Sequence, residues 1–441
     1  MELIIGFIVF VAIMLVCLIK GYTMLIALIA GLFIFATVAC RKGFSIKEVT
    51  RLGVDGVKDA IVVSEVMLLI GFVTAIWRSS GTITFFVYYG IKIITPSTFI
   101  VVTFLLCTVL SYALGTSFGV AGTVGVIFIA LARSGGVSEI VTAGAIMSGI
   151  YFGDRNSPVS SSAILVAAIT HTKLYDNVKM MMRTVILPYG ISLAVYIVLS
   201  ILNPIQKVDQ NMLDTLQDEF SISWWCIIPA LCILILPLLK VEVIKALIAS
   251  IVTGFIISLA VEKMPLLTVL KTCIFGYEAQ ESNLGSILNG GGMLSMIEVV
   301  CIVALSSSYS GIFAGTNLLA DMQSVVQKLM HKIGRFWALT VVGIGTIAIF
   351  CNQTIASMMV SDIFKKPYEE DGATREELAM DIESSVIVLS GVVPWAIACS
   401  VPLKFMQVGF GAVPLSILIF LIPITYGLTK GHFFPGSTRK K

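Results

Sequence analysis

Two acidic residues of this sequence lie in apolar segments, next to residues that interrupt helices. Asp154 belongs to the run Gly153-Asp-Arg-Asn-Ser-Pro-Val-Ser-Ser-Ser162, and Glu383 precedes two serines. A carboxylate near the centre of a membrane helix costs about 3 kcal/mol and is usually retained for ion or proton handling. The alternative is a surface acid hydrated by a loop, or, for Asp154, one neutralised by Arg155. We favour ion or proton binding at both acids.

Hydroxyl and amide side chains gather at four interruptions of the apolar pattern, two in each half of the chain. Their oxygens suit a small monovalent cation, towards which helix C-termini also direct carbonyls. Helix N-termini at the same breaks would suit the carboxylate of an organic solute, so both ligands stay open. The candidate ion-binding or substrate-binding residues are Asp154, Ser157, Ser160, Ser161, Ser162, Thr116, Ser117, Asn352, Gln353, Thr354, Glu383 and Ser385.

Two further acids, Glu65 and Glu298, also lie inside apolar runs. Each is a candidate for a proton relay, and the alternative is a structural ion pair. We expect no cofactor, and no metal beyond a transported sodium ion at Asp154.

Gly115-Thr-Ser-Phe-Gly119 matches the G-x-S-x-G pattern, which would make Ser117 the nucleophile of a hydrolase. That reading requires a strand before the serine, but the segment continues an apolar helical run. The three histidines, His171, His331 and His432, all lie in polar connectors or the tail, far from a catalytic arrangement. A membrane-embedded hydrolase therefore remains a remote alternative, and we do not expect an enzyme.

The composition requires lipid as the solvent for most of the surface. The 441 residues are 57% hydrophobic and 12% charged, against about 25% charged in soluble domains. Apolar runs close to the ~20 residues that cross a bilayer recur throughout, and backbone in lipid must be helical. The net charge of +3 is small and dispersed, so nucleic acid is not an expected partner.

The sequence predicts an all-α polytopic membrane protein with about 10–13 transmembrane helices, arranged in two inverted repeats with re-entrant or broken helices. Ser80-Gly81 precedes Asp154 by about as many residues as Ser310-Gly311 precedes Glu383, which favours two related units. The predicted spans lie near residues 3–19, 22–40, 61–77, 98–114, 120–132, 138–152, 184–202, 223–239, 241–261, 293–308, 334–350, 380–400 and 409–429.

The predicted organisation has six parts. They are the N-terminal helices and amphipathic connector (1–60), a first transport repeat (61–202), a polar linker (203–222), scaffold helices (223–292), a second transport repeat (293–429) and a basic tail (430–441). Five cations of the connector, Arg41, Lys42, Lys47, Arg51 and Lys58, favour its cytoplasmic placement, as Lys430, Arg439, Lys440 and Lys441 do for the C-terminus.

Several motifs together resemble the NhaC-type sodium/proton antiporter family, over most of the chain. In the first half they are Trp77-Arg-Ser-Ser-Gly81, Tyr88-Tyr-Gly-Ile-Lys92, Gly115-Thr-Ser-Phe-Gly119, Thr142-Ala-Gly-Ala-Ile146 and Tyr151-Phe-Gly-Asp-Arg155 through Ser157-Pro158. In the second half they are Gly291-Gly-Met-Leu-Ser-Met296, Asn352-Gln353, Ile382-Glu-Ser-Ser385 and Pro394-Trp395. The resemblance implies alternating access and exchange of sodium for protons or a related solute at the inner membrane.

The chain departs from this family at Ser161, Asn352 and Ser384, where the family pattern carries acids. Fewer anionic ligands weaken cation binding and remove proton-exchange sites. We therefore predict a secondary antiporter, with sodium/proton exchange as the first hypothesis. Exchange of a small organic acid or amino acid, driven by sodium or protons, is the alternative, and a passive channel is a remote one. The lipid bilayer and the transported ions are the expected partners, and a homodimer stays open.

Overall fold

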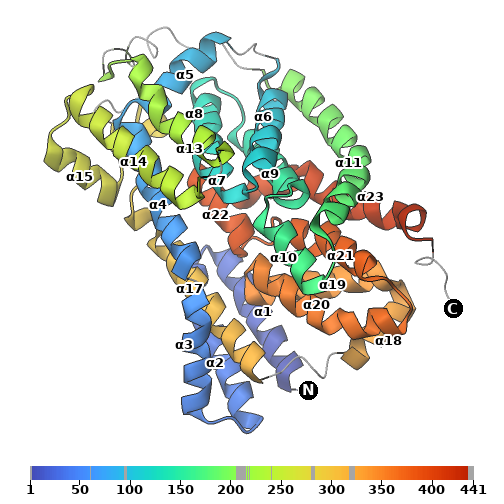
Figure 1. Ribbon diagram of the computed structural model, residues 1–441. Coiled ribbons are helices and arrows are strands. Elements are labelled where there is room, and N and C mark those ends of the chain that lie inside the picture. Colours follow the sequence, from blue (N-terminus) through green and yellow to red (C-terminus); the bar gives the residue numbers. More distant parts are fainter. Residues whose placement is uncertain are drawn as a thin grey trace.

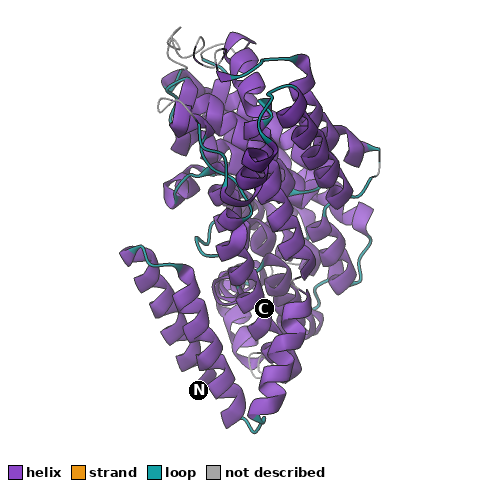
Figure 2. Ribbon diagram, turned by 90° about the vertical axis from the view of Figure 1, so that its left-hand side faces the viewer, coloured by secondary structure: helices purple, strands orange, loops and turns teal. Residues whose placement is uncertain are grey.

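The computed structural model describes residues 2–59, 61–93, 97–204, 215, 217, 219–239, 241–279, 284–316 and 323–435. Helices make up the regular structure of these residues, apart from an isolated bridge between Tyr277 and Gly290 (Figure 2). Most of the predicted linker 203–222, including Asp209 and Asp214, lies outside the described residues, as do the last cations of the tail. The predicted all-helical fold is confirmed.

The N-terminal part is a group of helices that reaches away from the centre of the molecule (Figure 1). It consists of α1 (Glu2–Lys20), α2 (Met24–Arg41), α3 (Ile46–Asp59) and much of α17 (Leu294–Thr316). The predicted amphipathic connector is helix α3. Its glycines pack against α17 so closely that a Cβ atom on Gly56 would lie 2.2 Å from the Ser307 carbonyl oxygen. Its charged residues, among them Arg51, face outward.

The first half of the chain continues with a bent pair and a set of broken helices. Its elements are α4 (Ile61–Ser79), α5 (Thr82–Ile93), α6 (Phe99–Leu114), α7 (Ser117–Val120), the π-helix η1 (Ala121–Gly125), α8 (Val126–Ser134), α9 (Glu139–Asn156), α10 (Ser161–Thr170) and α11 (Leu174–Leu202). Helices α4 and α5 meet at an angle of 63° at Ser80-Gly81. A positive φ of 67° at Gly81, which glycine adopts without strain, permits this bend.

The middle of the chain packs against α4. Its elements are the 3₁₀ helix η2 (Trp224–Ile227), α13 (Ile228–Leu238), α14 (Val243–Ala260), α15 (Leu266–Phe275) and the short α16 (Gly285–Leu288). Trp77 on α4 donates a hydrogen bond of 2.9 Å to the Ser250 hydroxyl on α14, so polar groups in this packing are satisfied internally.

The second half after α17 again consists of broken helices. Its elements are α18 (Gln323–Ile333), α19 (Arg335–Phe350), α20 (Gln353–Glu370), α21 (Arg375–Ile382), the π-helix η5 (Glu383–Ile387), α22 (Ile397–Met406), the 3₁₀ helix η6 (Phe410–Leu415) and α23 (Ile417–Phe433). The single span predicted at 380–400 is therefore divided, because the backbone leaves the helix around Pro394-Trp395 before α22 begins. The predicted break at Pro394-Trp395 is confirmed.

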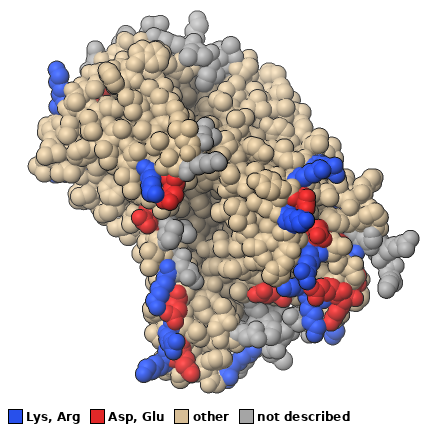
Figure 3. Space-filling view, in the orientation of Figure 1, with Lys and Arg blue, Asp and Glu red and all other residues tan. Residues whose placement is uncertain are grey.

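The described helices are apolar enough for a multi-pass membrane protein. Five of them have the length and composition to cross a bilayer, α4 and α5 together could form a sixth span, and eight shorter helices are also apolar. Figure 3 shows that charged side chains on one face gather in a few clusters and leave wide uncharged areas. Exposed apolar residues such as Phe33 and Leu428 are those that a lipid solvent would cover.

The two halves repeat the same helix lengths and caps at a constant distance along the chain. Adding 236 to the residue numbers of α6, of the segment α7–α8 and of α10 gives the bounds of α19, α20 and α22. Gly115 and Cys351, at equivalent positions, both have left-handed backbone, and so do His171 and Gln407. This correspondence pairs Asp154 with Ser390, whereas the sequence spacing pairs it with Glu383.

Candidate functional site

The starts of α7, α10, α20 and α22 come together near the middle of the molecule (Figure 1). Residues from these four helix breaks line one small cavity. It has a volume of about 100 Å³. The lining residues come from the starts of α7, α10, α20 and α22 and from the end of α9. They are Thr116, Ser117, Phe118, Asp154, Ser161, Ser162, Asn352, Gln353, Thr354, Ile397 and Ala398. The breaks that the sequence predicts in each half thus form a single site.

Asp154 is the one carboxylate in this lining. It lies in the last turn of α9 and is only 4% exposed. Its Oδ2 accepts a hydrogen bond of 3.0 Å from the Gln353 amide and one of 3.3 Å from the Ser162 hydroxyl. A buried carboxylate held by neutral donors, without a cation beside it, is the kind of group that binds a proton or a metal ion.

Gln353 connects the two halves of the site. Its Nε2 donates to Asp154 and, at 2.9 Å, to the Ser162 hydroxyl, both on the first half. Its Oε1 accepts a hydrogen bond of 3.0 Å from Ser390, the residue equivalent to Asp154 in the second half. The Gln353 amide therefore lies between Asp154 and its counterpart Ser390.

Three of the four helix N-termini at the cavity, those of α7, α10 and α20, are capped by side chains. Thr116 accepts from the Gly119 N–H at the start of α7, and Asn352 accepts from the Thr354 and Ile355 N–H groups at the start of α20. Ser160 accepts from the Ser162 N–H at the start of α10. Such residues favour a helix start because they satisfy N–H groups that lack partners in the helix. The positive ends of these helices surround Asp154.

Arg155 does not neutralise Asp154. The fully buried guanidinium donates to neutral oxygens, those of the Glu383 and Met181 carbonyls and of the Asn156, Thr184 and Ser384 side chains. Arg155 thus ties the end of α9 to α11 and η5. The carboxylate of Asp154 is left to the amide and hydroxyl groups of the cavity.

Glu383 lies outside the cavity lining and begins the π-helix η5. Its side chain is 0% exposed, and neither carboxyl oxygen has a hydrogen-bond partner among the described residues. π-Helical turns occur frequently at functional sites. An ionised carboxylate without a partner is very costly in a protein interior, which makes Glu383 a candidate for carrying a proton.

Several other predicted residues have local partners outside the cavity. The Ser157 hydroxyl donates to the Tyr112 carbonyl at 2.6 Å, Ser160 donates to the Asp154 main chain, and Ser385 donates to the Asp381 main chain. Glu65 is exposed on α4.

Glu298 forms an ion pair of 2.6 Å with Lys404 and accepts a hydrogen bond from Thr23. This is the structural pairing that the sequence left open for Glu298.

Sequence reasoning missed Ser390, whose single hydroxyl in an apolar run gives no signal. It also missed a buried ionic network in the second half. Lys430 binds Glu377 and Asp381, and Arg335 also pairs with Glu377. The network includes the Tyr368 and Tyr426 hydroxyls, which donate to Asp381. Asp381 looks like a residue of a helix start in the sequence, but it lies near the end of α21, fully buried.

No cluster of three or more His, Cys, Asp or Glu residues that could hold a metal occurs in the described part of the chain. Ser117 follows helix α6 after a two-residue break, not a strand, so the arrangement of a nucleophile elbow is missing around it. The cavity offers one carboxylate with hydroxyl and amide oxygens, a set that suits a monovalent cation or a proton.

Comparison with known proteins gives relatives over most of the chain. A malate-2H⁺/Na⁺-lactate antiporter of Bacillus subtilis is 25% identical over 411 residues, 89% of this chain and 88% of the relative. The Na⁺/H⁺ antiporter NhaC of Alkalihalophilus pseudofirmus is 25% identical over 377 residues, covering 84% and 82%. The arginine/ornithine antiporter ArcD of Halobacterium salinarum is 25% identical over 392 residues, covering 84% and 81%.

The profile of the Na⁺/H⁺ antiporter family matches residues 149–428. This match covers more than half of the chain and includes Asp154, the three breaks that follow it along the chain and the buried ionic network except Lys430. Together with the breaks that meet at one buried acid, it identifies the chain as a secondary antiporter that belongs to the Na⁺/H⁺ antiporter family.

Proposed function

We propose that this antiporter exchanges sodium ions for protons across the inner membrane, with Asp154 binding either ion in turn. The observation that carries the proposal is the position of the buried Asp154 as the one carboxylate that lines a cavity where breaks from both halves meet. One carboxylate is neutralised by one proton or by one sodium ion, but not by both together. Competition for that site couples the two fluxes.

Sodium binding at Asp154 requires Gln353 to move. Its NH₂ group donates a hydrogen bond to Oδ2 of Asp154, where a cation would lie. Turning the amide presents Oε1 to the ion instead, and the hydroxyls of Ser117 and Ser162 supply further oxygens from the lining. Asp154 with a bound proton or sodium ion is neutral. Without either ion its carboxylate is charged, and moving that charge through a low-dielectric interior is costly.

Glu383 is proposed as a second proton carrier. Its carboxyl group has no partner in this conformation and therefore holds a proton here. Arg155 lies next to it, bonded to its main-chain carbonyl. Release of the proton in the opposite conformation would be compensated by this guanidinium.

The two sets of residues 61–202 and 293–429 are proposed as inverted transport repeats that rock around the cavity in alternating access. The constant spacing of helix bounds and caps between the halves supports this division. We further propose that the basic connector and the C-terminus face the cytoplasm, since Lys and Arg favour that side.

A second candidate is exchange of a small organic acid or amino acid. The helix N-termini around the cavity favour a carboxylate, and two relatives are named for malate and lactate and for arginine and ornithine. The absence of acids at Ser161, Asn352 and Ser384 also lowers the cation-binding charge of the site.

Everted membrane vesicles separate the two candidates. With an imposed acid interior, sodium addition is expected to collapse the pH gradient, and Asp154→Asn is expected to abolish that response. A gradient that sodium leaves intact would overturn sodium/proton exchange. Uptake of labelled malate, lactate or arginine in the same vesicles, lost in Asp154→Asn, would then establish the second candidate.

A further inference from the structure

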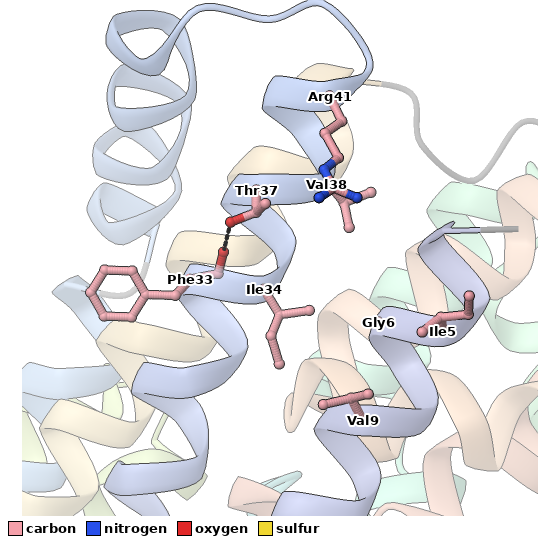
Figure 4. A pocket seen from close by; sticks show the side chains of 8 residues that line it. All are labelled: Ile5, Gly6, Val9, Phe33, Ile34, Thr37, Val38 and Arg41. Atoms are coloured by element: carbon pink, nitrogen blue, oxygen red, sulfur yellow. Dashed lines mark hydrogen bonds between the residues drawn. The ribbon is translucent and has the colours of Figure 1, made fainter.

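The walls of the ion cavity come from both halves of the molecule and lie close together. The cavity has a volume of about 100 Å³ and a polar lining. The groove between α1 and α2 differs in both respects, since its volume is about 390 Å³ and its lining is mostly apolar (Figure 4). Cavity size and the arrangement of oxygen ligands both help a site to discriminate between cations. What holds the walls of the small cavity in place therefore bears on which ion it prefers.

One wall of the cavity is the start of α22, where Ile397 and Ala398 belong to the lining. This helix start has no side-chain cap. The Ile397 N–H instead donates a hydrogen bond of 2.8 Å to the Cys351 carbonyl, at the end of α19. That bond joins two broken helices of the second half. It does not fix the wall relative to Asp154, which belongs to the first half.

A proline inside α22 removes a donor from this wall. Pro402 has no N–H, and in a regular α-helix the N–H at that position would donate to the carbonyl four residues earlier, that of Ala398. The hydroxyl of Tyr151 on α9 supplies a donor to this carbonyl, at 2.8 Å. The first-half equivalent of Pro402 is Val166, which has an N–H. The need for an outside donor is therefore specific to the second half.

Tyr151 joins the start of α22 to the helix that carries Asp154. It is 0% exposed and precedes Asp154 by three residues, so the two side chains are neighbours on the surface of α9. Its ring lies against Gly391, where a Cβ atom would lie 2.6 Å from two ring carbons. A glycine at this position therefore admits the ring. The hydrogen bond from Tyr151 to Ala398 fixes the wall formed by α22 relative to α9.

We propose that Tyr151 is a positioning residue for ion selectivity, because its hydroxyl holds the start of α22 where the cavity favours sodium over the larger potassium ion. This inference rests on the proposed exchange of sodium for protons. Tyr151 is not among the lining residues and acts through Ala398, which is. Without the hydroxyl, the Ala398 carbonyl loses its donor, the start of α22 shifts, and the site accepts the larger ion more readily.

The test uses everted vesicles with an imposed acid interior and compares the sodium and potassium concentrations that give half of the maximal response. Tyr151→Phe is expected to lower the preference for sodium about fivefold, the effect of one hydrogen bond. Tyr196→Phe is the matched control. Tyr196 is also 0% exposed and donates to a carbonyl at 2.8 Å, that of Leu415, but neither residue lines the cavity. This control should lower thermal stability in detergent and leave the ion preference unchanged.

Pro402→Ala tests the origin of the effect. The N–H that this substitution introduces is placed to donate to the Ala398 carbonyl within α22, which makes the Tyr151 hydroxyl dispensable. In the Pro402→Ala background, Tyr151→Phe is therefore expected to change the ion preference by less than about twofold.

A Tyr151→Phe variant with the wild-type preference for sodium would overturn this inference and leave the proposed exchange intact. The same holds if Tyr151→Phe has an equal effect in both backgrounds, or if Tyr196→Phe shifts the preference as much, since general packing would then be the cause. A wild-type protein that responds equally to both cations would also overturn it. A wild-type protein that responds to neither would overturn the proposed exchange together with this inference.

Discussion

The two halves of the molecule place helices of equal length at equal intervals but fill them with different chemistry. The first half carries Asp154 and Arg155 at the break after α9, where the second half has Ser390 and Gly391. The second half instead buries the network of Arg335, Glu377, Asp381 and Lys430.

The first-half positions equivalent to Arg335, Glu377 and Asp381 are the apolar Phe99, Val141 and Ala145. The same backbone thus supports a polar interior in one half and an apolar one in the other. The break is the common element, since it supplies the cavity in both halves. The charges around it are specific to each half, and we infer that the ion chemistry is divided between them.

The largest expected effect on exchange comes from substituting Asp154, which has no acidic counterpart in the second half. Asp154→Asn is expected to lower exchange in vesicles by more than about 100-fold. The neutral amide does not take up a proton and has no negative charge to balance a bound cation. Its second-half counterpart provides the matched control. Ser390→Ala removes one hydrogen bond to Gln353 and is expected to lower exchange only about fivefold. Equal losses in the two variants would mean that the halves share the ion chemistry.

The network that only the second half has is expected to govern stability. Lys430→Met leaves Asp381 and Glu377 buried with less positive charge beside them, and the expected loss in the free energy of unfolding is about 3–5 kcal/mol. Thermal unfolding in detergent measures it. Tyr426→Phe removes one neutral donor to Asp381 and should cost about 1 kcal/mol. If Lys430→Met were as mild as Tyr426→Phe, the network would not stabilise the second half.

The sequence predicted the breaks because the residues that cap helices stand out in apolar runs. Thr116 and Asn352 are of this kind, and both cap helices at the cavity. The network was not predictable in the same way, because Lys430 lies 49 residues from Asp381 along the chain. Only the packing of α23 on α21 brings these charges together.

The pairing of Asp154 with Glu383 illustrates a second limit of the sequence. The structure pairs Asp154 with Ser390, seven residues beyond Glu383. Seven residues are about two helical turns, so both registers place the residue on nearly the same face of the helix. Spacing alone could not choose between the two registers. The equivalent caps of the broken helices identify the register that pairs Asp154 with Ser390.

Substitution of Gln353, whose amide lies between the two halves, should have an intermediate effect on exchange. Gln353→Leu keeps the size of the side chain but leaves the Asp154, Ser162 and Ser390 side chains without their shared partner. Loss of such hydrogen bonds at a binding site costs about 1–2 kcal/mol, so exchange is expected to fall about tenfold. Initial rates at several sodium concentrations measure it. A variant with wild-type rates at every concentration would show that Gln353 takes no part in ion binding.

The smallest expected effect comes from removing a helix cap, and its cost in the free energy of unfolding should be the same in both halves. Ser138 and Thr374 occupy equivalent positions and cap α9 and α21, each through a hydrogen bond from the N–H three residues on. Ser138→Ala and Thr374→Ala should each lower the free energy of unfolding by about 1 kcal/mol.

Both caps lie away from the cavity, so exchange rates should change little. Thr374, however, begins the helix that carries Glu377 and Asp381, whereas Ser138 begins one with Val141 and Ala145 at those positions. A cost at Thr374 clearly above that at Ser138, measured in the same unfolding experiment, would mean that the network depends on this helix start. The two halves would then differ in backbone stability as well as in charge.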